Sequence, residues 1–165
     1  MNEKLFREMQ DAGRVLVDVA RMDEDGATLE GATGDILDLH SEYIRPLGGI
    51  AYSLEATPAG PELLVRGSLR ATLEAECSRC NRTFSFDVSV DGFAESFELD
   101  PAAEFLDITD AIREAVILEI PAFPVHDPGC KGLCAQCGAD LNDGPCGCAA
   151  KGSDSRWGAL DGLGV

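Results

Sequence analysis

The chain has 165 residues, of which 45% are hydrophobic, and a formal net charge of -17 from 13 basic and 30 acidic residues. This hydrophobic content is sufficient for a core and excludes wholesale disorder, while the length is typical of one domain with a small appended module. No apolar run approaches the roughly 18–20 residues that a membrane-spanning helix needs. Because a nucleic-acid-binding surface must be basic, the charge disfavours direct RNA contact and favours a basic protein partner.

The first residues of the chain argue against secretion. Charged side chains interrupt residues 1–10, which contain neither an apolar segment nor a small-residue cleavage site. The sequence therefore predicts a cytoplasmic protein that does not enter a membrane. In that reducing compartment clustered cysteines are more often metal ligands than disulfides, and seven cysteines is an odd number for disulfide pairing.

Short elements are predicted for the first third of the chain. Residues 2–12 carry apolar side chains at helical spacing and predict a short helix. The apolar residues of 15–19 predict a strand. Acidic residues and glycines predict a loop over 22–35, and the apolar residues of 36–39 predict another short strand.

The middle of the chain has the clearest pattern. Apolar and polar residues alternate over 50–56, and turn-forming residues follow at 57–61. A long alternation over 62–77 predicts an antiparallel strand that is buried on one face. The alternation resumes over 84–90, so the first pair of cysteines is expected at the tip of a hairpin. A further strand is predicted over 93–99.

The last third begins with a helix and then changes composition. Residues 107–120 predict a helix that Asp107 or Thr109 caps and that Pro121 ends. Residues 121–128 are rich in proline and are expected to be extended. Five cysteines and six glycines then fall within 129–152, which cannot build an apolar core and predicts a module held by metal.

These elements predict an α+β fold in which an antiparallel sheet, as a meander or a partly closed barrel, carries one or two helices. We expect this α+β domain to span residues 1–125. A small zinc-stabilised module is expected over residues 126–165, and its last part, with Trp157 and Leu160, is expected to form a docking tail.

The candidate ligands of zinc are seven cysteines and one histidine, in the order Cys77, Cys80, His126, Cys130, Cys134, Cys137, Cys146 and Cys148. Structural zinc is held by four nitrogen or sulfur ligands, and a Cys-x2-Cys turn presents two thiolates to one ion. A glycine directly after the second such turn, Gly138, suits the positive φ that this loop often needs. The pattern therefore predicts one or two structural zinc ions.

Three ligand arrangements fit the spacing. In the first, Cys134, Cys137, Cys146 and Cys148 close a local site, which leaves Cys77, Cys80 and Cys130 to form a second site with His126. In the second, one ion is held by Cys77 and Cys80 with two of the later five cysteines. In the third, one local site uses the first four cysteines of the C-terminal five.

Outside the cysteines, one group of side chains departs from the acidic character of the chain. Four arginines fall within 17 residues and could contact RNA or a partner, although pairing with neighbouring carboxylates is the simpler interpretation; they are Arg66, Arg70, Arg79 and Arg82. The sequence contains no nucleophile elbow, phosphate-binding loop, dinucleotide fingerprint or HExxH motif. It therefore predicts no catalytic residue and no enzymatic activity.

Several motifs in order resemble the YceD family, the large ribosomal RNA subunit accumulation proteins. They are Arg45-Pro46-Leu47-Gly48, Glu76-Cys77-Ser78-Arg79-Cys80, Ile117-Leu118-Glu119-Ile120-Pro121, the run from Cys130 to Asn142, and the tail Asp154-Ser155-Arg156-Trp157-Gly158-Ala159-Leu160. The resemblance covers about residues 36–163, and Ser155 stands where the family pattern has proline. It implies a role in accumulation of 23S ribosomal RNA and in large-subunit assembly, and a genomic association with a small basic ribosomal protein.

Three functional hypotheses follow. The first is a non-enzymatic factor for large-subunit assembly that carries structural zinc and binds a large-subunit precursor through a basic ribosomal protein or assembly factor. The second is a redox-regulated chaperone or sensor, in which oxidation of the thiolates releases zinc. The third is a direct binder of ribosomal RNA through the four arginines, with an affinity that falls steeply as salt increases.

Overall fold

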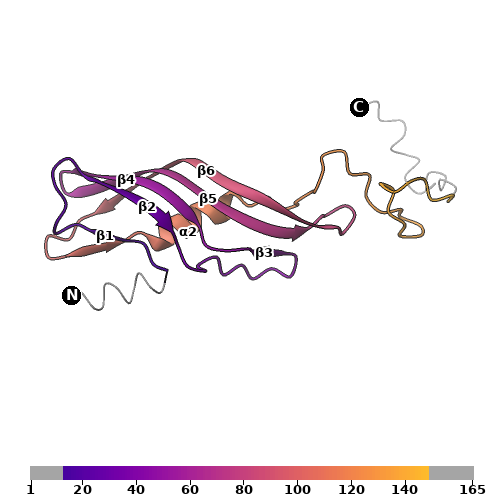
Figure 1. Ribbon diagram of the computed structural model, residues 1–165, viewed down its shortest axis with the longest axis horizontal. Helices are drawn as coiled ribbons and strands as arrows, with labels where there is room; N and C mark the ends of the chain where they lie inside the picture. The colour runs from indigo at the N-terminus through magenta and orange to yellow at the C-terminus, as the bar shows by residue number, and fades with distance from the viewer. Residues whose placement is uncertain (1–12, 149–165) are drawn as a thin grey trace, which may run out of the picture.

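The computed structural model describes residues 13–148, so the predicted helix at 2–12 and the predicted tail at 153–163 lie outside the described residues. Within residues 13–148 there are seven strands and one helix. In chain order these are β1 (Leu16–Asp18), β2 (Ala27–Ala32), β3 (Ile44–Pro46), β4 (Ala51–Ala59), β5 (Glu62–Glu76), β6 (Thr83–Glu98), β7 (Phe105–Asp107) and α2 (Thr109–Glu119). Together they form what we call the sheet body, residues 15–120 (Figure 1).

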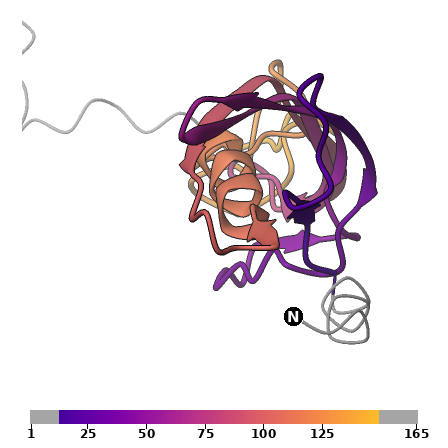
Figure 2. The ribbon, with the colours of Figure 1, turned by 90° about the vertical axis from the view of Figure 1, so that its left-hand side faces the viewer.

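Five of the strands form one antiparallel sheet around β5. β4 and β3 pair with successive parts of one edge of β5, β6 pairs along its other edge, and β2 pairs with β4. β1 and β7 form a separate antiparallel pair. The large sheet curls around α2, as the view along the molecule shows (Figure 2). The predicted α+β class, with an antiparallel, partly closed sheet, is confirmed.

β5 supplies more buried core side chains than any other element, as its alternating sequence predicts. One face of the strand is buried throughout, and its buried side chains are Leu63, Val65, Leu69, Ala71, Leu73 and Ala75. The opposite face is largely exposed and carries the polar residues. Since side chains alternate across a strand, the period-two pattern alone selects which face is covered by α2.

The strands predicted over 84–90 and 93–99 are one continuous strand, β6, interrupted by a bulge. Gly67 pairs with Phe93, whereas Leu69 pairs with Val90, so β6 contains one extra residue at this point. Gly67 has a φ of 151°, and a Cβ added there would lie 2.1 Å from the carbonyl oxygen of Ser53. A glycine is therefore required where the sheet bends.

The prediction of a loop over 22–35 is wrong for residues 27–32, which form β2. Every residue of β2 pairs with β4, from Ala27 opposite Ala56 to Ala32 opposite Ala51. β2 lies at the edge of the sheet and is mostly exposed, so its side chains can be polar and small. Its strand conformation comes from backbone pairing, which leaves no alternation of apolar residues in the sequence.

The strand predicted over 36–39 is also wrong. Leu37 is buried in the core and Ile36 and Leu39 pack against it, but the backbone does not join a sheet. The amides of Asp38 and Leu39 instead donate to carbonyl oxygens two residues earlier, at 3.0 and 2.9 Å. The apolar residues are therefore present because they are buried, and the backbone forms successive tight turns.

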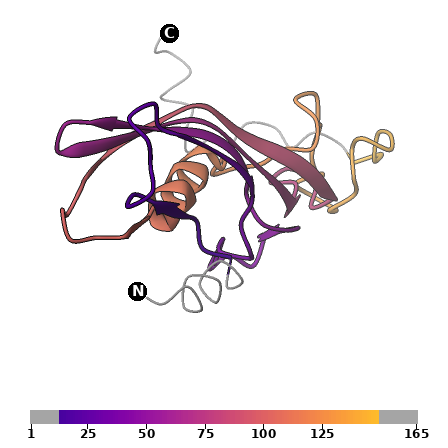
Figure 3. The same cartoon turned by 60° about the vertical axis from the view of Figure 1, so that its left-hand side comes forward.

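α2 fills the concave side of the sheet (Figure 3), where Ile112 and Val116 are fully buried. The predicted cap differs in detail. Ile108 occupies the N-cap position, and the Asp107 carboxylate accepts a hydrogen bond from the Thr109 amide at 3.0 Å. Thr109 accepts a bond from the Val15 amide at 2.9 Å, which joins the helix to β1. In residues 13–148 no helix has the length and apolar character needed to cross a membrane.

Candidate metal centre

The turn between β5 and β6 brings the first two cysteines together. The Cys77 amide donates to the Arg82 carbonyl oxygen at 2.8 Å, and the Asn81 amide donates to the Cys77 carbonyl oxygen at 2.9 Å. Asn81 has a φ of 59°, a conformation that asparagine tolerates better than most residues. The long hairpin therefore ends in a tight loop that carries both Cys77 and Cys80.

A second turn, at Cys134–Gly138, has the same backbone geometry. The Gly138 amide donates to the Cys134 carbonyl oxygen at 2.9 Å, as Asn81 does at the first turn. Gly138 has a φ of 72°, so the glycine that follows the pair adopts the positive φ expected from the sequence. The Gln136 amide also donates to the Cys134 sulfur at 3.4 Å. Both loops thus have the form in which two cysteines can bind one ion.

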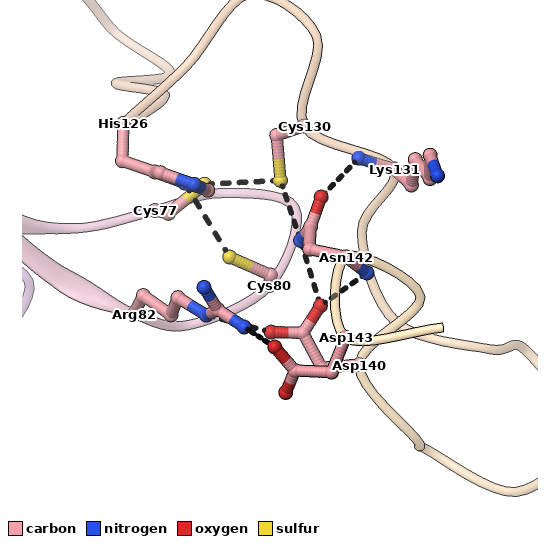
Figure 4. Close-up of polar contacts among 9 residues, drawn as sticks. All are labelled: Cys77, Cys80, Arg82, His126, Cys130, Lys131, Asp140, Asn142 and Asp143. Atoms are coloured by element: carbon pink, nitrogen blue, oxygen red, sulfur yellow. Dashed lines mark hydrogen bonds and ion pairs between the residues drawn. The ribbon is translucent and has the colours of Figure 1, made fainter. Parts of the chain in front are cut away.

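The inner group consists of Cys77, Cys80, His126 and Cys130, whose ligand atoms all lie within 4.8 Å of one another. The sulfurs of Cys77 and Cys130 are 3.9 Å apart, and the Cys80 sulfur is 3.5 Å from His126 Nδ1 (Figure 4). The three cysteines are buried, and Phe84 and Val125 pack against them. The inner group therefore joins the hairpin tip to a segment about 50 residues later in the chain.

The outer group consists of Cys134, Cys137, Cys146 and Cys148, and its four sulfurs also lie within 4.8 Å of one another. Cys137 and Cys148 are exposed, and Cys134 and Cys146 are partly exposed. The outer group is local, since all its members come from the Cys-rich segment, which we define as residues 126–148. The structure thus gathers the eight predicted ligands as the first of the three arrangements.

The thiols of the inner group differ in pKa, so that one of them ionises before the others. Burial acts to raise the pKa of Cys77, but hydrogen bonds from His126 and from the amides of Arg79 and Cys80 outweigh it and lower the pKa to about 5. Burial raises the pKa of Cys80 to about 11, with the neighbouring thiols Cys77 and Cys130 adding to the shift. Cys77 is therefore favoured as a thiolate while Cys80 keeps its proton.

The outer group shows the same division of charge. Hydrogen bonds from the amides of Cys137 and Gln136 lower the pKa of Cys134 to about 6. Interactions with Cys137 and Cys146, followed by burial, raise the pKa of Cys148 to about 12. A divalent cation removes this conflict, because it stabilises several thiolates at once. Two cysteine-rich groups in the described residues could therefore hold metal ions.

Asn142 supports the inner group and was not predicted as a site residue. Its side-chain amide donates to the Cys130 sulfur at 3.4 Å, while its Oδ1 accepts from the Lys131 amide at 2.8 Å (Figure 4). Asp140 in turn accepts from the Asn142 amide at 2.8 Å. That hydrogen bond is the main reason that the pKa of Asp140 is lowered. Asn142 therefore orients the candidate ligand Cys130 from outside the set of candidate ligands.

The arginines at the hairpin tip contact the Cys-rich segment. Arg82 forms ion pairs with Asp140, at 2.8 Å, and with Asp143. Arg79 donates to the carbonyl oxygens of Pro128 and Cys130 at 3.1 and 3.0 Å. These contacts join residues 128–143 to the hairpin tip. They add to the connection that the clustered side chains of the inner group already make.

The other two predicted arginines lie elsewhere. Arg66 and Arg70 are exposed on β5, and neither forms an ion pair with a carboxylate of residues 13–148. The structure therefore does not gather the four arginines into one basic patch. Two of them lie on the sheet, and the other two bind the chain's own carboxylates and carbonyl groups.

Comparison with known proteins identifies relatives of part of the chain. The model of the YceD family, described as large ribosomal RNA subunit accumulation protein YceD, matches residues 95–164. A chloroplastic protein of Arabidopsis thaliana, named large ribosomal RNA subunit accumulation protein YCED homolog 1, is 36% identical over 69 residues, which cover 42% of this chain and 22% of the relative. Its Zea mays counterpart is 51% identical over 43 residues, covering 26% of this chain and 15% of the relative.

An uncharacterized protein of Mycobacterium tuberculosis is 34% identical over 112 residues, which cover 59% of this chain and 54% of that protein. The chain thus spans about half the length of the mycobacterial relative and about a fifth of the Arabidopsis one. No solved structure matches the chain. The matched region contains His126 and all the cysteines from Cys130 onward. The predicted resemblance to the YceD family is confirmed, and the family model matches it over residues 95–164.

Proposed function

We propose that this chain is a non-enzymatic, cytoplasmic factor for accumulation of 23S ribosomal RNA and assembly of the large ribosomal subunit. The observation that carries the proposal is the family match over residues 95–164, whose relatives are named for large ribosomal RNA subunit accumulation. We further propose that the chain acts by binding a basic ribosomal protein or an assembly factor on the precursor. The net charge of -17 supports a basic partner, because opposite charges steer association.

We propose that both groups hold structural zinc, with three cysteines and one histidine as ligands in the inner group and four cysteines in the outer group. Each provides four nitrogen or sulfur donors, which is the closed set that zinc takes in structural sites. When bound, zinc would stabilise the thiolates by offsetting part of their charge, and it would cross-link the chain. His126 and Cys130 would then be held on the hairpin tip, in a segment with little apolar core of its own.

The contacts of the arginines support a protein partner over direct RNA binding. Arg79 and Arg82 are the arginines nearest the candidate metal centre, and both are engaged within the chain. A phosphate would have to displace Asp140 and Asp143 from Arg82, in a molecule that is strongly acidic overall. Arg66 and Arg70 are the remaining candidates for an RNA contact.

The proposal is tested by affinity purification from the native cells after gentle cross-linking, at about 0.15 M salt, where the Debye length is about 8 Å. We expect large-subunit precursors together with a basic ribosomal protein or assembly factor. After ribonuclease treatment, the direct protein partner should remain bound. Recovery of the chain alone would contradict the proposal, and an association lost with ribonuclease would favour direct RNA binding.

A redox sensor is the second candidate, and the outer group is the observation that favours it. Cys134 is partly exposed and its pKa is lowered to about 6, so its thiolate can be reached by an oxidant. Hydrogen peroxide would oxidise two thiolates to a disulfide and be reduced to water, which would release zinc. Zinc release at mild peroxide concentrations, together with a change in partner binding, would support this function, and retention of zinc would contradict it.

A further inference from the structure

A groove with both apolar and polar walls lies beside the inner group, between the segment that leads into β3 and the segment that follows α2. Its volume is about 410 Å³, and its walls include Tyr43, Ile44, Glu76, Ala122, Phe123 and Pro124. Tyr43 is 63% exposed and Phe123 is 81% exposed, so the groove presents two aromatic side chains to solvent. Exposed apolar surface of this kind is characteristic of binding sites.

Both walls of the groove are fixed to the hairpin. The Glu76 amide donates to the Tyr43 carbonyl oxygen at 3.0 Å, which ties the first wall to the end of β5. The Ser78 amide and hydroxyl both donate to the Pro124 carbonyl oxygen at 2.9 Å, which ties the second wall to the tip. A groove whose backbone is already held in place loses little entropy when a ligand enters it.

An acidic hollow of about 310 Å³ adjoins the groove and shares Tyr43, Ile44 and Glu76 with it. It is also lined by Glu42, Glu74 and Arg45. Arg45 forms an ion pair with Glu74, so two of the three carboxylates have no cation against them among the residues that line the hollow. The combined surface therefore offers an apolar slot with negative charge at its side.

We propose that this surface binds a basic peptide segment of a protein partner, with one apolar side chain between Tyr43 and Phe123 and a lysine or arginine over the acidic hollow. The charge of the hollow complements such a segment, whereas a second copy of this chain, with a net charge of -17, would be repelled. The proposal rests on the proposed function, because it gives the basic partner a place to bind.

The test measures binding of a fluorescent peptide built from lysine and leucine to the zinc-loaded full chain. Phe123→Ala should weaken binding about tenfold, as truncation of an aromatic anchor does. Because Phe123 is mostly exposed, this variant should fold normally. Leu118→Ala is the matched control, since Leu118 is 77% exposed but does not line the groove, and it should bind as the wild type does. Glu42→Gln should weaken binding and reduce its dependence on salt.

Two further peptides check the chemistry of the ligand. Replacing leucine by serine should abolish binding, and so should replacing lysine by glutamate. Equal binding by the wild type and Phe123→Ala, or equal losses in Phe123→Ala and Leu118→Ala, would overturn the proposal. A wild-type dimer that Phe123→Ala dissociates in sedimentation would also overturn it, because a second copy would then occupy the groove.

The same variants separate this proposal from the proposed function. If the wild type and Phe123→Ala purify equal amounts of large-subunit precursor, the groove proposal fails and the proposed function stands. If the wild type binds the peptide through Phe123 but purifies no ribosomal material, the groove proposal stands and the proposed function fails.

Discussion

The sheet body and the Cys-rich segment are held together by different interactions. In the sheet body, side chains such as Leu63, Leu73 and Ile112 are completely buried, and apolar burial supplies the stability. In residues 126–148, Cys130 is the one side chain that is buried, and the contacts are hydrogen bonds, ion pairs and clustered thiols. One chain therefore combines a region that folds by excluding water with a region that has little apolar burial and that we propose is stabilised by metal ligation.

The largest expected effect is the loss of metal from the outer group. Cys134→Ser combined with Cys137→Ser removes two of its four ligands and should unfold the local turn structure, since structural zinc supplies roughly 10–16 kcal/mol of binding free energy in small zinc modules. The melting temperature of the sheet body should remain unchanged. Zinc content by mass spectrometry and amide spectra by NMR measure the two effects. If the turn at Cys134–Gly138 stays folded in the zinc-free variant, the Cys-rich segment does not depend on metal and differs less from the sheet body than we propose.

The next effect lies in the sheet body. Leu73→Ala should lower the free energy of unfolding by about 2–5 kcal/mol, because it leaves a cavity at a position with no exposed surface. Urea unfolding measures the change, and Leu118→Ala is the exposed control, for which no comparable loss is expected. Zinc content should stay at the wild-type level in the native variant. Loss of zinc at the same time would show that the two regions are not energetically separate.

Acidification should distinguish the two groups. Protons compete with metal for thiolates, so metal affinity is greatest where the thiols are ionised and is lost as the pH falls through their pKa values. The pKa values of Cys134 and Cys77 are both lowered, and the outer group is the more exposed of the two, so it should release its metal at a higher pH than the inner group. A chelating dye that records zinc release from pH 8 to pH 4 tests the order. Release of both ions in one step would contradict it.

The smallest effect is expected at the hairpin tip. Arg82→Ala removes the ion pairs with Asp140 and Asp143, which are partly exposed and contribute little to stability. We expect faster amide hydrogen exchange over residues 139–143, with an unchanged melting temperature and zinc content. Arg66→Ala is a matched control on β5. A large loss of zinc in Arg82→Ala would show that the ion pairs, and not ligation alone, assemble the centre.

Much of the sheet body follows from the sequence. The alternation over 62–77 predicts β5 and its buried face, because every second side chain must be apolar on a half-buried strand. β2 is not predictable in this way, since it is an exposed edge strand formed by backbone pairing with β4. At residues 36–39 a strand was predicted where the structure has none. Leu37 is buried there, but a segment of irregular backbone can also bury apolar side chains.

The sequence predicted the eight candidate ligands of the metal centre, but it did not decide which of them share an ion. The spacing of the cysteines indicates two Cys-x2-Cys turns, because that signal is local. Three ligand arrangements remained, since only the tertiary fold brings Cys77 within 3.9 Å of Cys130 across 53 residues. The contact of Asn142 with the Cys130 sulfur has no signal in composition or periodicity, and Asn142 stood out only as the end of a family motif.

The length of the β5–β6 hairpin has a consequence for reach. The 15 residues of β5 span roughly 50 Å at about 3.3 Å per residue. The tip of the hairpin, which carries Cys77 and Cys80, therefore lies at the opposite end of the sheet body from β1 and its partner β7 (Figure 1). Deleting two residues from each strand would move the tip about 7 Å closer and keep each side chain on its face of the sheet. Deleting one residue from each strand would instead move every side chain beyond the deletion to the opposite face. The lengths of β5 and β6 thus set the distance between the hairpin tip and the β1–β7 pair.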